Sequence, residues 1–265
     1  MSVNCFNGYE PIFHYTTFES AIKILASKKL RFGVMNKMND PDESFRQIFI
    51  NTGRKFVDNY NCLSIDAISE EFQHYQQISF SCSSPKKAGF QLQNMWGNYA
   101  DKGYGVCLVF DKKIINEMHP SYSGKVRYSH NNKPTLMLPT FTNKKDFHTH
   151  ISKHIKSIFF KKSDEWRSEQ EYRIIQYFEK PTNNYLSLHN FWENALKCII
   201  FTYAPDVALE ENVFNSSNFK AISMLAHNSC MLLQKAKDIN GNDILYDSNR
   251  ITKWGQIINE SELEI

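Results

Sequence analysis

The chain has 265 residues, of which 42% are hydrophobic and 14% aromatic, so it can bury a sizeable core in one large domain or two small ones. Its formal net charge of +3 is too small to indicate a nucleic-acid partner. No apolar run approaches the roughly 20 residues that a membrane helix needs, and the first residues lack the features of a secretory signal. The six cysteines lie far apart, with no CxxC pair, so we predict buried free thiols and a cytoplasmic location.

The first ordered segment is predicted to be a strand, a helix and a second strand. Residues 11–15 (PIFHY) have a β-like pattern, and Thr16 with Glu19 matches a capping box at the start of a helix. Apolar residues then recur at helical spacing. Residues 30–32 (LRF) form the second short strand.

The rest of the chain alternates irregularly between helical and strand patterns. Residues 36–43 are predicted to be a turn-rich loop hinged at Asn39-Asp40-Pro41, which we expect Asp40 or Glu43 to anchor without metal. The other expected helices are 44–60, 64–76, 90–100, 146–161 and 219–226, and the expected strands are 78–82, 106–110, 126–128, 172–177 and 196–203. A hairpin of residues 229–236 and 243–246 is expected around Asn240-Gly241.

This order of elements lacks the regular alternation of a doubly wound α/β fold. We therefore predict a single α+β domain over residues 1–265, with a mixed or antiparallel sheet of short strands surrounded by helices. A poorly specified tail is expected from about residue 250.

Residues 161–178 (KKSDEWRSEQEYRIIQYF) hold the densest group of charges in the chain. If EYRIIQYF is a strand, Glu169, Glu171 and Arg173 lie two residues apart and share one face. Such a row is costly to bury unless its charges are paired. Two interpretations stay open: a solvated sheet face, or a site where an arginine orients a carboxylate.

Histidine and tyrosine supply further candidates. His148, His150 and His154 fall on one predicted helix, but flanking lysines oppose a cation, so we expect a polar helix face and no metal site. His14 ends a strand directly before a helix, where it either binds a neighbouring loop or presents a ring nitrogen to a cleft. Tyr15 or Tyr99 would either pack in the core or stack on a flat ligand ring.

Several blocks in order carry a family resemblance: FHYTT, MNDPDE, ISFSC, MWGNYADKGYGVCLVF, VRY, FKKSDEWRSEQEYRII and KCIIF. From about residue 12 to 235, the chain resembles a widespread bacterial family of uncharacterised domains with FNDPxE, MWxxYA and WxxExEYR blocks. It departs from the pattern in the loop, where Met38 replaces phenylalanine and Asp42 separates Pro41 from Glu43.

The opening His-Tyr-Thr strand, its capped helix and the LRF strand are also similar to the start of ADP-ribosyltransferase-like domains. The resemblance implies NAD as substrate, with His14 contacting the ribose and Tyr99 stacking on nicotinamide. It implies that Glu171 or Glu169 is the late catalytic carboxylate. Tyr15 and Thr16, which follow His14 in the sequence, are also expected to bind the cofactor. Arg173 is a candidate for binding the phosphates of the cofactor.

Three functions follow from these expectations. The first is an NAD-consuming transferase or glycohydrolase without a metal, such as a bacterial toxin or phage-defence effector, whose acceptor is not indicated. The second is a non-catalytic ligand-binding or sensor module. The third is a nuclease-type effector in which Asp40, Glu43, Glu169 and Glu171 surround Mg²⁺.

Overall fold

The computed structural model describes residues 6–34, 63–118, 122–130, 141–202, 217–237 and 240–247. The chain forms two compact units. Unit 1 comprises residues 1–29, 80–119 and 187–265, and unit 2 comprises residues 30–79 and 120–186. Each unit mixes helices with mostly antiparallel strands, which confirms the predicted α+β class. The single domain over residues 1–265 stays a prediction.

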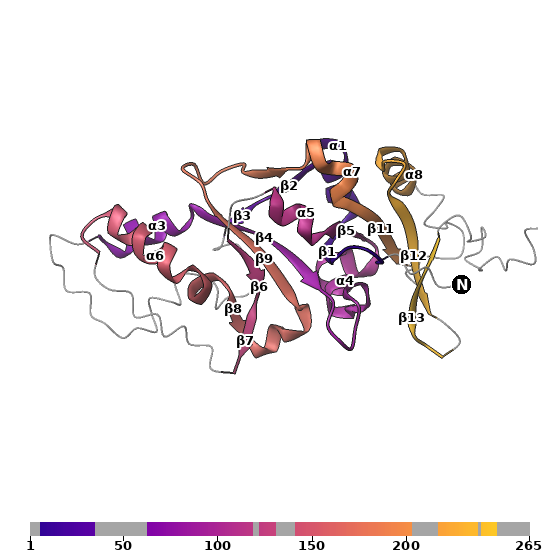
Figure 1. Cartoon of the computed structure of the whole chain (residues 1–265), viewed down its shortest axis with the longest axis horizontal. Helices are drawn as coiled ribbons and strands as arrows, with labels where there is room; N and C mark the ends of the chain where they lie inside the picture. The colour runs from indigo at the N-terminus through magenta and orange to yellow at the C-terminus, as the bar shows by residue number, and fades with distance from the viewer. Residues whose placement is uncertain are drawn as a thin grey trace, which may run out of the picture. The chain divides into compact units, whose positions relative to one another are not determined.

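Unit 1 is built on a sheet with the strand order β13-β12-β11-β5-β1 (Figure 1). The strands are β1 (Pro11–Thr16), β5 (Val106–Asp111), β11 (Leu196–Thr202), β12 (Met231–Lys237) and β13 (Asp243–Asp247). β11 and β12 are parallel, whereas β12–β13, β11–β5 and β5–β1 are antiparallel pairs. The last residues of β4 (Tyr75–Cys82) pair with β1 through Ile12 and Phe13.

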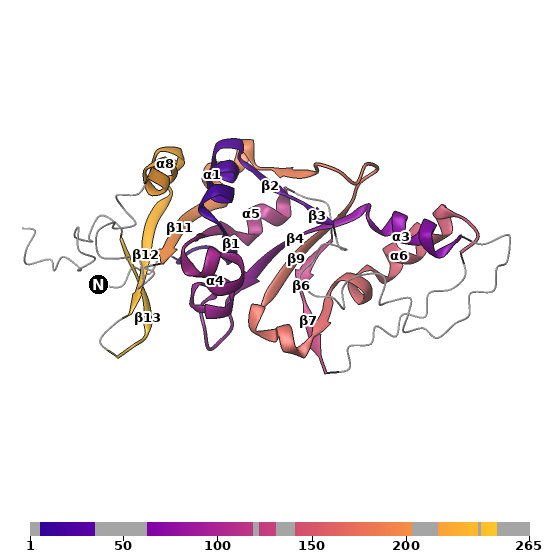
Figure 2. The ribbon, with the colours of Figure 1, turned by 180° about the vertical axis from the view of Figure 1, so that it is seen from behind.

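Helices cover both faces of this sheet. The one-turn helix η3 (Gly89–Gln91) and α4 (Gln93–Tyr99) pack on the face that carries Phe13 and Tyr15, and α4 lies against β1 (Figure 2). The opposite face carries Phe110 and Phe201, which contact Trp192 and Phe18 respectively. Trp192 belongs to α7 (Trp192–Ala195), and Phe18 belongs to α1 (Phe18–Ser27). The remaining unit 1 elements are α5 (Lys112–Glu117), α8 (Ser217–Leu225), η4 (Asp101–Gly103) and η6 (His189–Phe191).

The turn between α4 and β5 depends on a glycine. A Cβ at Gly105 would lie closer than 3.0 Å to the Thr16 carbonyl oxygen and to the backbone of Ala100, whereas one at Gly97 would meet nothing within 4 Å. We expect Gly105→Ala to lower the free energy of unfolding by about 1–3 kcal/mol, the usual cost of overpacking. Gly97→Ala, in the exposed part of α4, is the matched control and should stabilise by about 0.5–1 kcal/mol. Urea unfolding measures both, and equal effects would contradict this packing.

Unit 2 contains the first residues of β4, which neighbour β9 (Glu171–Tyr177), and β9 in turn pairs with β6 (Tyr122–Lys125). β3 (Gly33–Val34) pairs with β4. A separate parallel pair joins β7 (Arg127–Ser129) to β8 (Lys161–Ser163). The other elements are α3 (Ile65–Phe72), α6 (Lys144–Phe159), η5 (Asp164–Glu169) and the strand pair of β2 (Lys29–Arg31) with β10 (Tyr185–Ser187).

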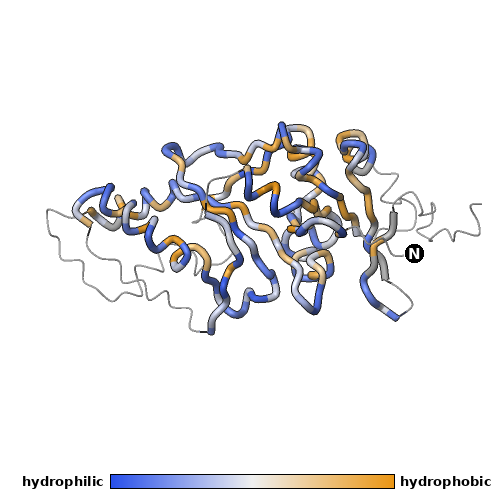
Figure 3. The backbone as a smooth tube through the Cα atoms, viewed as in Figure 1, coloured by the Kyte–Doolittle hydropathy of each residue, from blue (hydrophilic) through white to orange (hydrophobic). Residues whose placement is uncertain are grey.

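The core of unit 2 is aromatic. Helix α6 is amphipathic, and Figure 3 shows its trace alternating between hydrophilic and hydrophobic residues. Its buried stripe of Phe147, Ile151, Ile155 and Phe159 packs with Phe72, Tyr75 and Ile175. Phe72 contacts both Phe147 and Phe159 edge-on, the favoured geometry for aromatic pairs.

Most expected strands are confirmed, because β4, β5 and β9 contain the segments predicted from pattern, and β11 covers 196–202 of the expected 196–203. The hairpin of β12 and β13 is confirmed as an antiparallel pair. Cys82, Cys107, Cys198 and Cys230 are buried free thiols, as expected. None of the helices described is long and apolar enough to cross a membrane, and the cytoplasmic location stays a prediction.

Several predicted boundaries are wrong. The strands expected over 30–32 and 126–128 lie at Lys29–Arg31 and Arg127–Ser129, and the helix expected over 90–100 is interrupted at Leu92, whose backbone is extended between η3 and α4. The helix expected over 64–76 ends at Phe72, because Tyr75–Gln77 are already in β4. The helix expected over 146–161 ends at Phe159, and Lys161 belongs to β8. The cap of α1 is Thr17, whose hydroxyl accepts from the Ser20 N–H at 3.2 Å, since Thr16 is still paired in β1. The loop 36–43 with Met38, Asp40 and Glu43, the helix 44–60 and the tail from 250 lie outside the described residues.

Candidate functional site

The charged central segment is split between two elements. Glu171 and Arg173 lie on β9, as predicted, but Glu169 ends the 3-10 helix η5. The shared strand face predicted for all three residues is therefore wrong for Glu169. The reason is Gln170, whose left-handed backbone (φ 50°) turns the chain between the helix and the strand.

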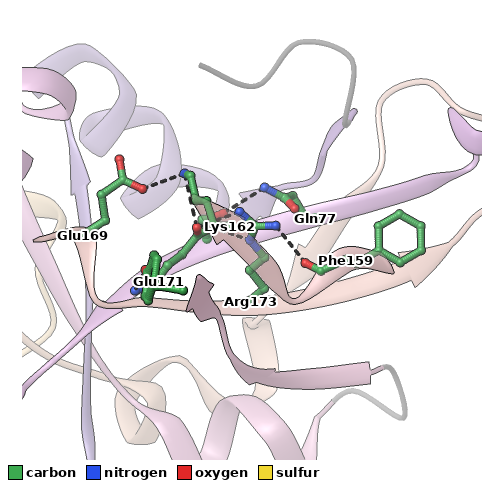
Figure 4. Close-up of polar contacts among 8 residues, drawn as sticks. Gln77, Phe159, Lys162, Glu169, Glu171 and Arg173 are labelled. Carbon is green, nitrogen blue, oxygen red and sulfur yellow. Dashed lines mark hydrogen bonds and ion pairs between the residues drawn. The ribbon is translucent and has the colours of Figure 1, made fainter. Parts of the chain in front are cut away.

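Glu171 and Arg173 form a buried, two-pronged ion pair (Figure 4). The Arg173 Nε donates to Glu171 Oε1 at 2.6 Å, and its Nη2 donates to Glu171 Oε2 at 2.7 Å. Arg173 Nη1 donates to the carbonyl oxygen of Phe159, at the end of α6, at 2.8 Å. The side chains of Arg173 and Glu171 are only 1% and 6% exposed. This parallel geometry is the strongest form of arginine–carboxylate contact.

A second cation, Lys162 of β8, completes the cluster. Its Nζ lies 2.7 Å from Glu169 Oε2 and 3.5 Å from Glu171 Oε2. It also lies 4.5 Å from the centroid of the Trp166 ring. The side chains of Lys162 and Glu169 are 5% and 4% exposed. The interpretation as a solvated sheet face is therefore wrong, and each buried carboxylate has a cation beside it.

These contacts set the ionisation of Glu171. Burial opposes the charged form, but Arg173 and then Lys162 overcome it and hold the pKa of Glu171 well below its usual range. The backbone N–H of Glu171 donates to the Tyr128 hydroxyl at 2.8 Å, which fixes the start of the strand. The result is an ionised carboxylate in one position.

This low pKa predicts how stability depends on pH. A depressed folded-state pKa stabilises the fold above the ordinary glutamate pKa of roughly 4.3, and this contribution is lost as the pH falls toward the folded-state pKa. We expect the melting temperature to fall steadily below about pH 4. Thermal unfolding between neutral and acid pH measures this fall. In Glu171→Gln, the melting temperature should depend less on pH. An identical acid dependence in that variant would contradict the assignment.

Unit 1 holds the other predicted residues. His14 is half-buried on β1, with its ring 5.7 Å from that of Phe80. Tyr15 is buried, its hydroxyl donates to the carbonyl of Gly89, and its ring meets Trp96 edge-on at 5.0 Å. Thr16 is 8% exposed. Of the two roles predicted for Tyr15, core packing is therefore the one that the structure shows.

His14 and Tyr99 lie on opposite faces of the unit 1 sheet. Tyr99 packs with the cluster that contains Tyr15 and Trp96. Side chains alternate along a strand, so His14 faces the other side, where Phe80 contacts Phe110. The structure brings Glu169, Glu171 and Arg173 together in unit 2, and does not bring His14 and Tyr99 together in unit 1.

Unit 2 holds a second polar cluster, around Glu71, that the sequence pattern does not predict. Glu71, 3% exposed, pairs with Lys144 and accepts from His148 Nε2 at 3.0 Å. Nδ1 of His148 lies 3.1 Å from the Tyr75 hydroxyl. His148 is thus used within the fold. The rings of His150 and His154 lie side by side on α6, tilted by 38° with centroids 4.4 Å apart. Among the residues with a described placement, no three potential ligands gather for a metal.

The sequence pattern does not single out Lys162 either, because the helix predicted over 146–161 ends just before it. The adjacent lysine is a signal that could have identified it. If residues 161–163 form a strand, Lys161 and Lys162 point to opposite faces, so one of the two lysines faces inward.

The comparisons with known proteins bear on this same region. Residues 95–174 match the family described as "Protein of unknown function (DUF2971)". The DUF2971 match runs from the MWGNYA block into β9 and includes Lys162, Glu169, Glu171 and Arg173. It confirms the resemblance to a family of uncharacterised domains, over less than half of the chain.

Two solved structures of DarT from Thermus sp. 2.9 align with most of the chain. The complex with carba-NAD+ is 11% identical, with 85% of this chain and 95% of that one covered, at a TM-score of 0.35. The complex with ADP-ribosylated ssDNA is 14% identical, with 87% and 96% covered, at a TM-score of 0.34. At these scores nothing about activity follows for this chain. None of the curated proteins matches it.

Proposed function

We propose that this protein consumes NAD, as an ADP-ribosyltransferase-like enzyme or an NAD glycohydrolase, with Glu171 as its catalytic carboxylate. One observation carries the proposal: the buried carboxylate of Glu171 is fixed by Arg173 and Lys162, at 2.6 Å and 2.7 Å to the arginine and 3.5 Å to the lysine. The strand-helix-strand opening through His14, which carries the sequence resemblance, supports it.

The chemistry needs such a carboxylate. The bond between the ribose C1 and the nicotinamide nitrogen breaks, nicotinamide leaves with the electron pair, and positive charge develops on the ribose. A fixed negative charge stabilises that state more than the ground state. An acceptor oxygen or water then bonds to C1 and loses its proton. Consumption of NAD in this way suits a toxin or phage-defence effector, which is the setting we propose.

The other predicted contacts remain separate proposals. His14 is proposed to contact the ribose, and His14→Ala should weaken NAD binding. Tyr99, half-buried on α4, is proposed to stack on a ligand ring. Thr16, the second residue after His14, is likewise proposed to contact NAD. Arg173 is a weaker candidate for the phosphates, because its Nε, Nη1 and Nη2 all donate within the protein.

A second candidate function is favoured by the same cluster. Both oxygens of Glu171 accept from Arg173, and the side chain is buried, so the four charges could serve only to hold β8 and β9 in place. The protein would then be a ligand-binding or sensor module without turnover. The nuclease hypothesis has less support, because Mg²⁺ would have to displace Lys162 and Arg173 from the carboxylate oxygens of Glu169 and Glu171.

Incubation of the purified protein with NAD, with and without EDTA, separates these functions. We expect nicotinamide release that the chelator does not change, with free ADP-ribose or a modified acceptor as the second product. NAD binding without release would favour the binding module. Chelator-sensitive cleavage of nucleic acid would favour the nuclease, and a wild-type protein that neither binds nor consumes NAD would overturn the proposal.

A further inference from the structure

Lys162 is the least expected member of the buried cluster. A lysine is almost never fully buried unless it is paired, because removing an ammonium group from water is costly. Here the side chain is 5% exposed and lies between two carboxylates, with the Trp166 ring on a third side. Figure 4 shows its ammonium group between Glu169 and Glu171. The lysine thus bridges two elements, η5 and β9.

The four charges of the cluster balance. Glu169 and Glu171 contribute two negative charges, and Lys162 and Arg173 contribute two positive ones. Removal of any one charge leaves a net charge in a buried place, which is strongly destabilising. Removal of one charge of each sign leaves the cluster neutral.

The contacts are not symmetric between the two glutamates. Glu171 is gripped by Arg173 through two hydrogen bonds and is also reached by Lys162. Glu169 is joined to this group by Lys162. Its position on η5, before the turn at Gln170, sets it apart from the strand that carries Glu171.

We infer that Lys162 is a positioning residue that holds Glu171 in its working place, and that Glu169 acts through Lys162 by anchoring its ammonium group. The inference rests on the proposed function in naming Glu171 as the working carboxylate. It separates the two glutamates that the sequence leaves equivalent: Glu171 carries the chemistry, and Glu169 does not touch the substrate.

A double-mutant cycle tests this inference. Lys162→Met, Glu169→Gln and the double variant are compared with wild type by thermal unfolding and by nicotinamide release across pH. Lys162→Met leaves the cluster with a net negative charge, so the double variant, which is neutral, should melt at a higher temperature than Lys162→Met alone. Glu169→Gln should lower the rate about tenfold in the presence of Lys162, as for residues coupled in one network, and should have no effect once Lys162 is absent.

The pH profile supplies a readout that a merely structural role would not move. Without Lys162 the carboxylate of Glu171 loses a nearby cation, so the acidic limb of the rate profile should move to higher pH in Lys162→Met. Lys162→Arg keeps the charge and should keep the wild-type limb. It also provides a folded variant if Lys162→Met does not fold.

Two results would overturn the inference. If Glu169→Gln lowers the rate by about 100-fold or more even in the Lys162→Met background, Glu169 acts on the substrate itself. If the double variant melts below Lys162→Met, the charges are not coupled as inferred. If wild type releases no nicotinamide, the proposed function fails, and the thermal cycle by itself decides whether Lys162 couples Glu169 to the cluster.

Discussion

Arg173→Met is expected to destabilise the protein by about 3–5 kcal/mol, the cost of removing one partner from a buried ion pair. The Arg173 side chain is 1% exposed, and without its guanidinium Glu171 loses two hydrogen bonds and the Phe159 carbonyl loses one. The Glu171 side chain is only 6% exposed, so water can compensate for little of this loss. Urea unfolding of wild type and variant measures the difference.

Arg173→Lys tests whether charge alone is enough. A lysine keeps the positive charge but cannot make two parallel bonds to a carboxylate and a third to a carbonyl. We expect it to recover only part of the lost stability. The matched control is Lys23→Met, which removes an exposed ion pair with Glu19 and should leave the free energy of unfolding nearly unchanged. A similarly small change in Arg173→Met would show that the buried pair contributes little.

The fold follows from the sequence where a strand is buried on both faces. The runs VCLVF and KCIIF predict β5 and β11 because only a covered strand tolerates such continuous apolar residues. The pattern fails at the end of α3, where Tyr75 continues the helical spacing of apolar residues after Phe72 but belongs to β4. Sheet pairing overrides local propensity there, and no local signal reports it.

The candidate site is predictable only in part. Alternation along a strand places Glu171 and Arg173 on one face, and the cost of burying charge predicts that they need partners. The identity of the partner is not local, because Lys162 reaches the site through β8, which pairs in parallel with β7. The backbone turn at Gln170, which removes Glu169 from the strand, leaves no mark on the charge pattern.

Glu171→Gln is expected to lower the rate of nicotinamide release by about 10²–10³, the loss typical of removing one electrostatic stabiliser. The amide keeps the shape of the side chain but cannot offset the charge that develops on the ribose. The variant also leaves the cluster with an excess positive charge, so a lower melting temperature is expected. Glu171→Gln combined with Lys162→Met restores neutrality and provides a better-folded variant that still lacks the carboxylate. Glu19→Gln, in an exposed pair on α1, is the control that should match wild type.

The most direct measurement is the rate of nicotinamide release per mole of folded protein, for wild type and Glu171→Gln, with the Kd for NAD determined on the same samples. We predict an NAD affinity within a few-fold of wild type and a rate reduced by about two to three orders of magnitude. Equal rates in the two proteins at temperatures where both are folded would contradict the assignment of Glu171 as the catalytic carboxylate.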